Sequence, residues 1–111
     1  MTVTVKVLIP AKIAEATQTT QYTATGVTTI IDKFTATNYS ASAATISINL
    51  VTVSGSAGNL NLITKTKTLQ PAEVYTFPEI VGQVLGSGDF ISTIAGTATS
   101  INIRASGREV S

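Results

Sequence analysis

The stretch that decides the fold is Ala43-Ala-Thr-Ile-Ser-Ile-Asn-Leu-Val-Thr-Val53. Within it, Ile46, Ile48 and Leu50 alternate with polar residues at every second position. Successive side chains of a strand point to opposite faces of a sheet, so this period of two predicts a strand with one buried face. The segment Ser54–Asn59 follows it with Gly, Ser and Asn and predicts a hairpin loop.

Seven other segments have strand-like patterns bounded by turn residues. They are Met1–Ile9, Thr19–Thr25, Thr28–Thr37, Leu60–Thr66, Glu73–Phe77, Phe90–Ala95 and Thr99–Ala105. Between two of them, the apolar spacing in Pro78–Leu85 predicts a short helical turn with Pro at its first position. The residues Ser106–Ser111 are predicted to form a tail. Eight short strands favour an all-β, jelly-roll-like antiparallel β-sandwich, and a seven-stranded immunoglobulin-like sandwich is the alternative.

The length of 111 residues predicts a single domain over residues 1–111. Its core is predicted from the alternation within strands and from the helical spacing. The expected core residues are Ile30, Phe34, Ile46, Ile48, Leu50, Leu62, Phe77, Val81 and Phe90.

The composition is poor in charge and in reactive side chains. Charged residues make up 12% of the chain, the net charge is +1, and there is no His or Cys. The commonest general base and the thiolate nucleophile are therefore missing, and the acids Asp32, Glu73, Glu79 and Asp89 belong to no recognisable motif. We expect no catalytic residue, no cofactor and no metal site. The scattered basic residues and the lack of a long apolar run predict binding to neither nucleic acid nor membrane.

The N-terminal strand has an unusual pattern. Val3, Val5, Val7 and Ile9 share one parity, and Lys6 is the only charge among the intervening residues. Pro10 cannot continue a central strand, so residues 1–16 are a candidate arm that pairs with a neighbouring chain. The alternative is an ordinary core or edge strand of the sandwich.

Three segments resemble a known class of proteins. These are Leu69-Gln-Pro-Ala-Glu-Val-Tyr-Thr-Phe-Pro-Glu-Ile-Val-Gly-Gln-Val-Leu-Gly-Ser-Gly-Asp89, Ile101-Asn-Ile-Arg-Ala-Ser-Gly-Arg-Glu-Val110 and Thr28-Thr-Ile-Ile-Asp-Lys-Phe-Thr-Ala-Thr-Asn38. Their Thr-rich strands and Pro-containing turn are similar to the small capsid decoration (cement or staple) proteins of tailed bacteriophages, such as that of epsilon15-like phages.

The resemblance implies a structural virion protein that binds the outer capsid surface and bridges capsid subunits. The implied partner is the major capsid protein of an HK97-like shell, and the chain itself would be a dimer or trimer on the particle. Its implied location is the outer capsid surface of the virion, and the host cytoplasm during assembly. The residues predicted for the protein interface are Val3, Val5, Val7, Tyr39 and Val110.

Two other functions compete with this expectation. A carbohydrate- or receptor-binding module of a tail, fibre or surface protein would use a polar-aromatic patch, for which Tyr22, Asn38 and Tyr39 are the candidates. A small hydrolase would use a pair of acids.

Overall fold

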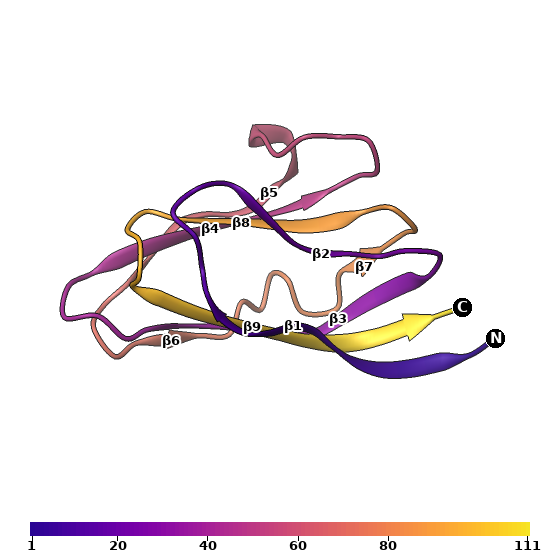
Figure 1. Ribbon diagram of the computed structural model, residues 1–111, viewed down its shortest axis with the longest axis horizontal. Coiled ribbons are helices and arrows are strands. Elements are labelled where there is room, and N and C mark those ends of the chain that lie inside the picture. Colours follow the sequence, from indigo (N-terminus) through magenta and orange to yellow (C-terminus); the bar gives the residue numbers. More distant parts are fainter.

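Two antiparallel sheets pack face to face in the computed structural model, which describes residues 1–111 (Figure 1). Sheet A has the order β1-β9-β3-β6, with β7 also pairing with β3, and sheet B has the order β2-β8-β4-β5. Every strand pair is antiparallel. The predicted all-β antiparallel sandwich is therefore confirmed.

The strands of sheet A are β1 (Val3–Ile13), β3 (Thr28–Asn38), β6 (Val74–Tyr75), β7 (Val84–Leu85) and β9 (Ile101–Val110). Those of sheet B are β2 (Thr19–Thr23), β4 (Ala44–Val51), β5 (Leu62–Leu69) and β8 (Phe90–Ala95). The two short strands β6 and β7 pair with different parts of β3 and together occupy the place of one interrupted strand. Counted in this way, the two four-stranded layers and their connections form a jelly roll.

The first and last strands both end later than the sequence predicts. Strand β1 continues through Pro10 to Ile13, because β1 is an edge strand and Pro10 lies within its second register shift, between Ile9 and Lys12, where no ladder N–H is required. Strand β9 extends to Val110, where a tail was predicted.

The helical turn lies in a different segment from the predicted one. The segment Pro78–Leu85 forms consecutive turns that end in β7, and the one helical turn, a 3-10 turn (η1), spans Asn59–Asn61.

The core lies between the two sheets and is built from both. Of the residues predicted for it, Phe34, Ile46, Ile48 and Phe77 are fully buried, and Leu50 packs against them while partly exposed. Phe34 and Phe77 contact edge to face with ring centroids 4.9 Å apart, an arrangement that adds to the area they bury.

Four predicted core residues are wrong. Ile30, Leu62 and Phe90 are only partly buried, and Val81 is exposed. The residues next to three of them, Ile31, Ile80 and Ile91, are fully buried instead. A shift by one position turns a side chain to the opposite face of a sheet, and irregular ladder positions in β3 and β5 produce such shifts.

The same effect changes the N-terminal strand. A bulge after Val7 places Leu8 and Ile9 in the core, so Ile9 does not share a face with the three valines before it. Beside this bulge, Gly107 allows β3 and β9 to approach closely. A Cβ atom there would lie 2.1 Å from the carbonyl oxygen of Ile30.

Candidate protein-binding face

The first candidate is a group of exposed valines on the outer face of sheet A. Val3, Val5 and Val7 project from β1, and 84% of the Val5 surface is exposed. Residues paired across an antiparallel ladder have side chains on the same face, so the register shows which residues accompany these valines.

Register brings this face together from four strands. Val5 pairs with Arg108, Arg108 with Ile30 and Ile30 with Val84, which makes a row across β1, β9, β3 and β7. A parallel row joins Val3 to Val110. We call this surface the valine face; it consists of Val3, Val5, Val7, Ile30, Val84 and Val110.

One ion pair lies within the valine face. The Arg108 guanidinium donates two hydrogen bonds of 2.9 Å to the carboxylate of Asp32. These hydrogen bonds hold the pKa of Asp32 below its usual value. Since both side chains are well exposed, the pair adds little to stability, but it neutralises the charge of Arg108.

Beyond this pair, the outer face of sheet A becomes basic. Lys33 pairs with Ser106 and Arg104 with Thr35, so both cations lie on the same outer face as Arg108. Neither cation forms an ion pair. The outer face of sheet A therefore combines an apolar end with a weakly basic middle.

Tyr39, the fifth predicted interface residue, lies elsewhere. It follows the end of β3, and its N–H donates to the carbonyl oxygen of Ser100 just before β9. The valine face is at the opposite end of these strands, where Thr28 pairs with Val110 next to the chain termini (Figure 1). The structure thus brings together four of the five predicted residues and separates Tyr39 from them.

The inner side of the same end carries a polar network. The hydroxyl of Tyr22 donates to the carboxylate of Glu109 and is hydrogen-bonded to Thr29, which ties β2 of sheet B to sheet A. Burial and the neighbouring Glu109 carboxylate raise the pKa of Tyr22 to about 12. The hydrogen bond from Tyr22, supported by Lys6, lowers the pKa of Glu109. Because its hydroxyl is used inside the fold, Tyr22 is poorly suited to a sugar-binding platform.

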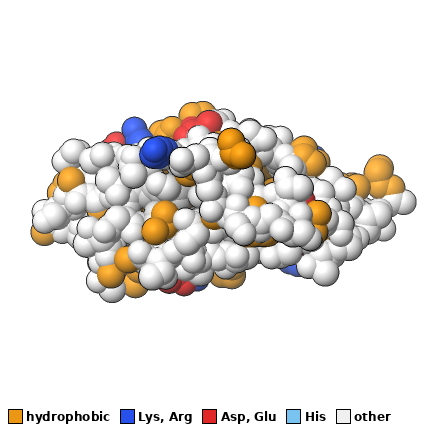
Figure 2. Space-filling model, turned by 90° about the horizontal axis from the view of Figure 1, so that it is seen from above, with side chains coloured by type: hydrophobic (Ala, Val, Ile, Leu, Met, Phe, Trp, Pro, Cys, Tyr) orange, Lys and Arg blue, Asp and Glu red, His pale blue; other side chains and the backbone are white.

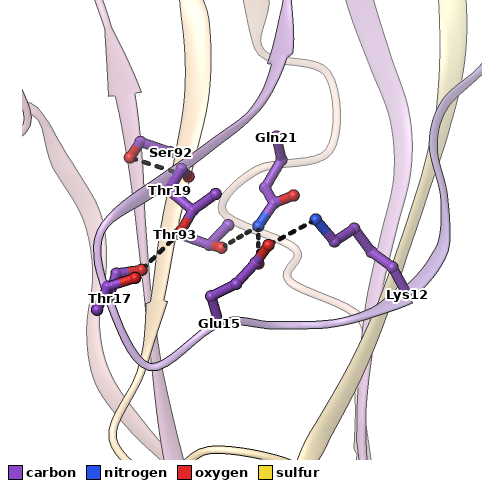
Figure 3. A network of polar contacts seen from close by, with 7 residues as sticks. All are labelled: Lys12, Glu15, Thr17, Thr19, Gln21, Ser92 and Thr93. Carbon is purple, nitrogen blue, oxygen red and sulfur yellow. Dashed lines mark hydrogen bonds and ion pairs between the residues drawn. The ribbon is translucent and has the colours of Figure 1, made fainter.

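A second network fastens the β1–β2 connection to β8 (Figure 3). The Gln21 amide donates to both Glu15 and Thr93, and Lys12 forms a 2.9 Å ion pair with Glu15. Hydrogen bonds from Lys12 and Gln21 lower the pKa of Glu15. The cluster holds the β1–β2 connection in place against β8.

A third cluster closes one side of the sandwich. Glu79 accepts hydrogen bonds from Thr64 of β5 and Tyr75 of β6, and the Lys67 ammonium lies 4.6 Å from the centre of the Tyr75 ring. Burial raises the pKa of Glu79, but these two hydrogen bonds, a backbone hydrogen bond and the charge of Lys67 together lower it.

All six acids are used in contacts of this kind. The remaining two carboxylates accept hydrogen bonds from backbone N–H groups, Glu73 from Gln70 and Asp89 from Val53 and Gly86. No group of three or more potential metal ligands occurs, and no buried side-chain nitrogen or oxygen lacks a hydrogen-bond partner. The chain has no helix with the length and apolar character needed to cross a bilayer.

The outer surface on the side of sheet B differs from the valine face. Seen from that side, it is mainly uncharged and polar, with hydrophobic side chains scattered among polar ones (Figure 2). The loop before β5 folds over this sheet and buries Ser47 and Asn49 of β4, where Asn49 donates to Gly58 and Asn61. A shallow polar hollow between this loop and Gln18 contains no aromatic side chain.

The chain matches no protein-family model, no curated protein sequence and no solved structure. Sequence reasoning missed Ile30 and Val84 as members of the valine face. The exposed side of Ile30 depends on the bulge at Asp32, and Val84 belongs to a two-residue strand without periodicity.

Proposed function

We propose that this protein is a non-catalytic structural component of a virion that binds the outer surface of a phage capsid and stabilises it by bridging capsid subunits. The observation that carries the proposal is the valine face, a group of exposed apolar side chains. The one ion pair within it, Arg108–Asp32, has no net charge. Contiguous exposed apolar patches on soluble domains mark interaction sites, and interface cores are depleted in charge.

The proposed partner is the major capsid protein of an HK97-like shell, which the resemblance of Thr28–Asn38 and Leu69–Asp89 to decoration proteins suggests. A shell displays many identical sites, so weak contacts add up when one molecule engages two neighbouring subunits. The proposal includes a dimeric or trimeric arrangement on the particle and a location on its outer surface. Catalysis has no part in it, since each acid of the chain accepts hydrogen bonds from the fold itself.

A charge placed on the valine face tests the proposal. Val5→Glu and Val84→Glu introduce a carboxylate that docking would remove from water, and each should weaken binding by roughly tenfold or more. Leu60→Glu is the matched control, because Leu60 is fully exposed on η1, on the side of sheet B. Binding is measured by co-sedimentation with capsid shells prepared without this chain, from the phage that encodes it. Equal binding by all three variants would contradict the proposal.

A further inference from the structure

The first half of β1 has an open hydrogen-bonding edge. Thr2 and Ser111 exchange two backbone hydrogen bonds of 2.8 and 2.9 Å, and the register then runs without a break to Val7 and Ser106. Hydrogen-bonded and non-hydrogen-bonded pairs alternate along an antiparallel ladder. The N–H and C=O groups of Val3, Val5 and Val7 therefore point away from β9. Strand β1 is the last strand of sheet A on that side.

This edge lacks the features that usually block pairing with another strand. Edge strands are protected by bulges, by proline, by charges or by being very short. Within Val3–Val7 there is no bulge or proline, and the single charge, Lys6, interacts with Glu109 at 3.3 Å. The bulge and Pro10 follow only after Val7.

The other sheet edges are all protected. Strands β6 and β7 have two residues each, β2 has an irregular position between Thr20 and Tyr22, and β5 has two register shifts and a positive φ of 44° at Thr66. Val3–Val7 is consequently the longest regular edge that the molecule leaves open.

We infer that Val3–Val7 binds an extended segment of the shell subunit as an additional strand of sheet A. This inference rests on the proposed function, and it specifies which part of the shell subunit would lie beside the valine face. Main-chain hydrogen bonds would supply much of the affinity, and alternate side chains would set specificity. The segment should carry apolar residues on the side of Val5, where they extend the valine face, and a hydroxyl or carboxylate opposite Lys6.

The size of the edge favours a shell segment over a second copy of this chain. Two copies related by a two-fold axis would pair symmetrically about Val5, because the bulge after Val7 ends the regular edge. Such a contact joins only five residues of each copy. It would fall well short of the roughly 1,200 Å² that stable interfaces bury. A shell segment adds area, because its own subunit covers the valine face as well.

Two substitutions at one position separate main-chain pairing from side-chain contact. Val5→Pro removes an outward N–H that has no partner within the fold, whereas Val5→Thr keeps this N–H and the branched side chain. In co-sedimentation with shells that lack the chain, Val5→Pro should weaken binding by roughly tenfold or more and Val5→Thr by less than about threefold. The melting temperature of each variant shows that it is folded.

Hydrogen exchange of the unmodified chain gives a second measurement. The amides of Val3, Val5 and Val7 should exchange rapidly in the free chain and become protected on shells, while that of Thr4 is protected in both states. The inference is overturned if Val5→Pro binds as well as Val5→Thr, if the three amides stay unprotected on shells, or if they become protected in a dimer without shells. Failure of the unmodified chain to bind shells would instead refute the proposed function, and this inference with it.

Discussion

Asp32 occupies the irregular position of β3 and decides what that strand buries on either side. Before it, Thr29 and Ile31 face the core; after it, Phe34 and Ala36 do. The first two residues have odd numbers and the last two have even numbers. In a regular strand they would lie on opposite faces, so Ile31 and Phe34 could not both be buried without the irregularity. Asp32 itself stays in solvent and pairs with Arg108 on the outer face.

The adjacent residues Ile30 and Ile31 provide a matched test of this register. Ile31 is fully buried, so Ile31→Ala should lower the free energy of unfolding by about 2–5 kcal/mol. Ile30→Ala removes the same atoms from the partly exposed valine face and should cost less than about 1.5 kcal/mol. Chemical denaturation of the two variants measures both values. A larger loss for Ile30→Ala would mean that the register is displaced by one residue.

The carboxylates predict how stability depends on pH. The pKa values of Glu15, Asp32, Glu79 and Glu109 are lowered in the fold by their hydrogen-bond donors. Groups with lowered pKa values contribute stability above their unfolded-state pKa, and this contribution disappears as the pH falls through the folded-state pKa. The melting temperature should therefore change little above about pH 5 and fall below about pH 4.

Tyr22→Phe isolates one of these contributions. It removes the hydroxyl that lowers the pKa of Glu109 most, so this pKa should return toward its usual value and the acid-induced fall should become smaller. Thermal unfolding of the variant and the unmodified chain between pH 7 and pH 2 compares the two slopes. An equal or steeper fall in the variant would exclude this role for Tyr22.

At the scale of elements, alternation was sufficient to predict the longer strands but not their irregular positions. The central strand β4 was found because Ile46, Ile48 and Leu50 all face the core. The two bulges of β1 cannot be read from its own residues, because a bulge exists only relative to the register of β9. Pro10 consequently predicts the end of a strand that in fact continues past it.

The candidate site was predictable only where one strand carries it. The alternating valines of β1 are visible in the sequence, and the interface role assigned to Val3, Val5, Val7, Tyr39 and Val110 remains a prediction. The neighbours Ile30 and Val84 become visible only after the register is known, since β3 and β7 are distant from β1 in the chain. Tyr39 is exposed, but it follows the end of β3 that lies away from the valine face.

Strand β1 divides into a part that is proposed to bind the shell and a part that the core requires. Deleting Thr2–Lys6 removes no buried side chain and should leave the domain folded while abolishing shell binding. Deleting Thr2–Ile9 also removes Leu8 and Ile9 from the core, at about 1.5–3 kcal/mol each, and should severely destabilise or unfold it. The longer truncation, which an independent arm would tolerate, therefore cannot separate binding from folding.

Thermal unfolding and co-sedimentation of the two truncated chains measure these effects. If deletion of Thr2–Lys6 alone unfolds the domain, the paired ends of β1 and β9 at the chain termini contribute far more to its stability than their burial indicates. If that variant is folded and still binds shells, the valine face is not the binding surface.

At the scale of the whole molecule, the outer faces of the two sheets differ in how much surface is free to contact a partner. The domain is elongated, with extents of 46 × 26 × 20 Å, and sheet A runs along its length (Figure 1). Its outer face carries the valine face at one end and the unpaired cations Lys33 and Arg104 further along. Sheet B is partly covered by its own loop. The proposed arrangement therefore places sheet A against the shell and the loop carrying η1 in solvent.

Electron cryomicroscopy of shells decorated with the unmodified chain tests this arrangement most directly. The map should show the outer face of sheet A in contact with capsid subunits, with Val5 and Val84 at the contact and Leu60 in solvent. A map in which sheet B or the end near Tyr39 contacts the shell, while the valine face is exposed to solvent, would contradict the account.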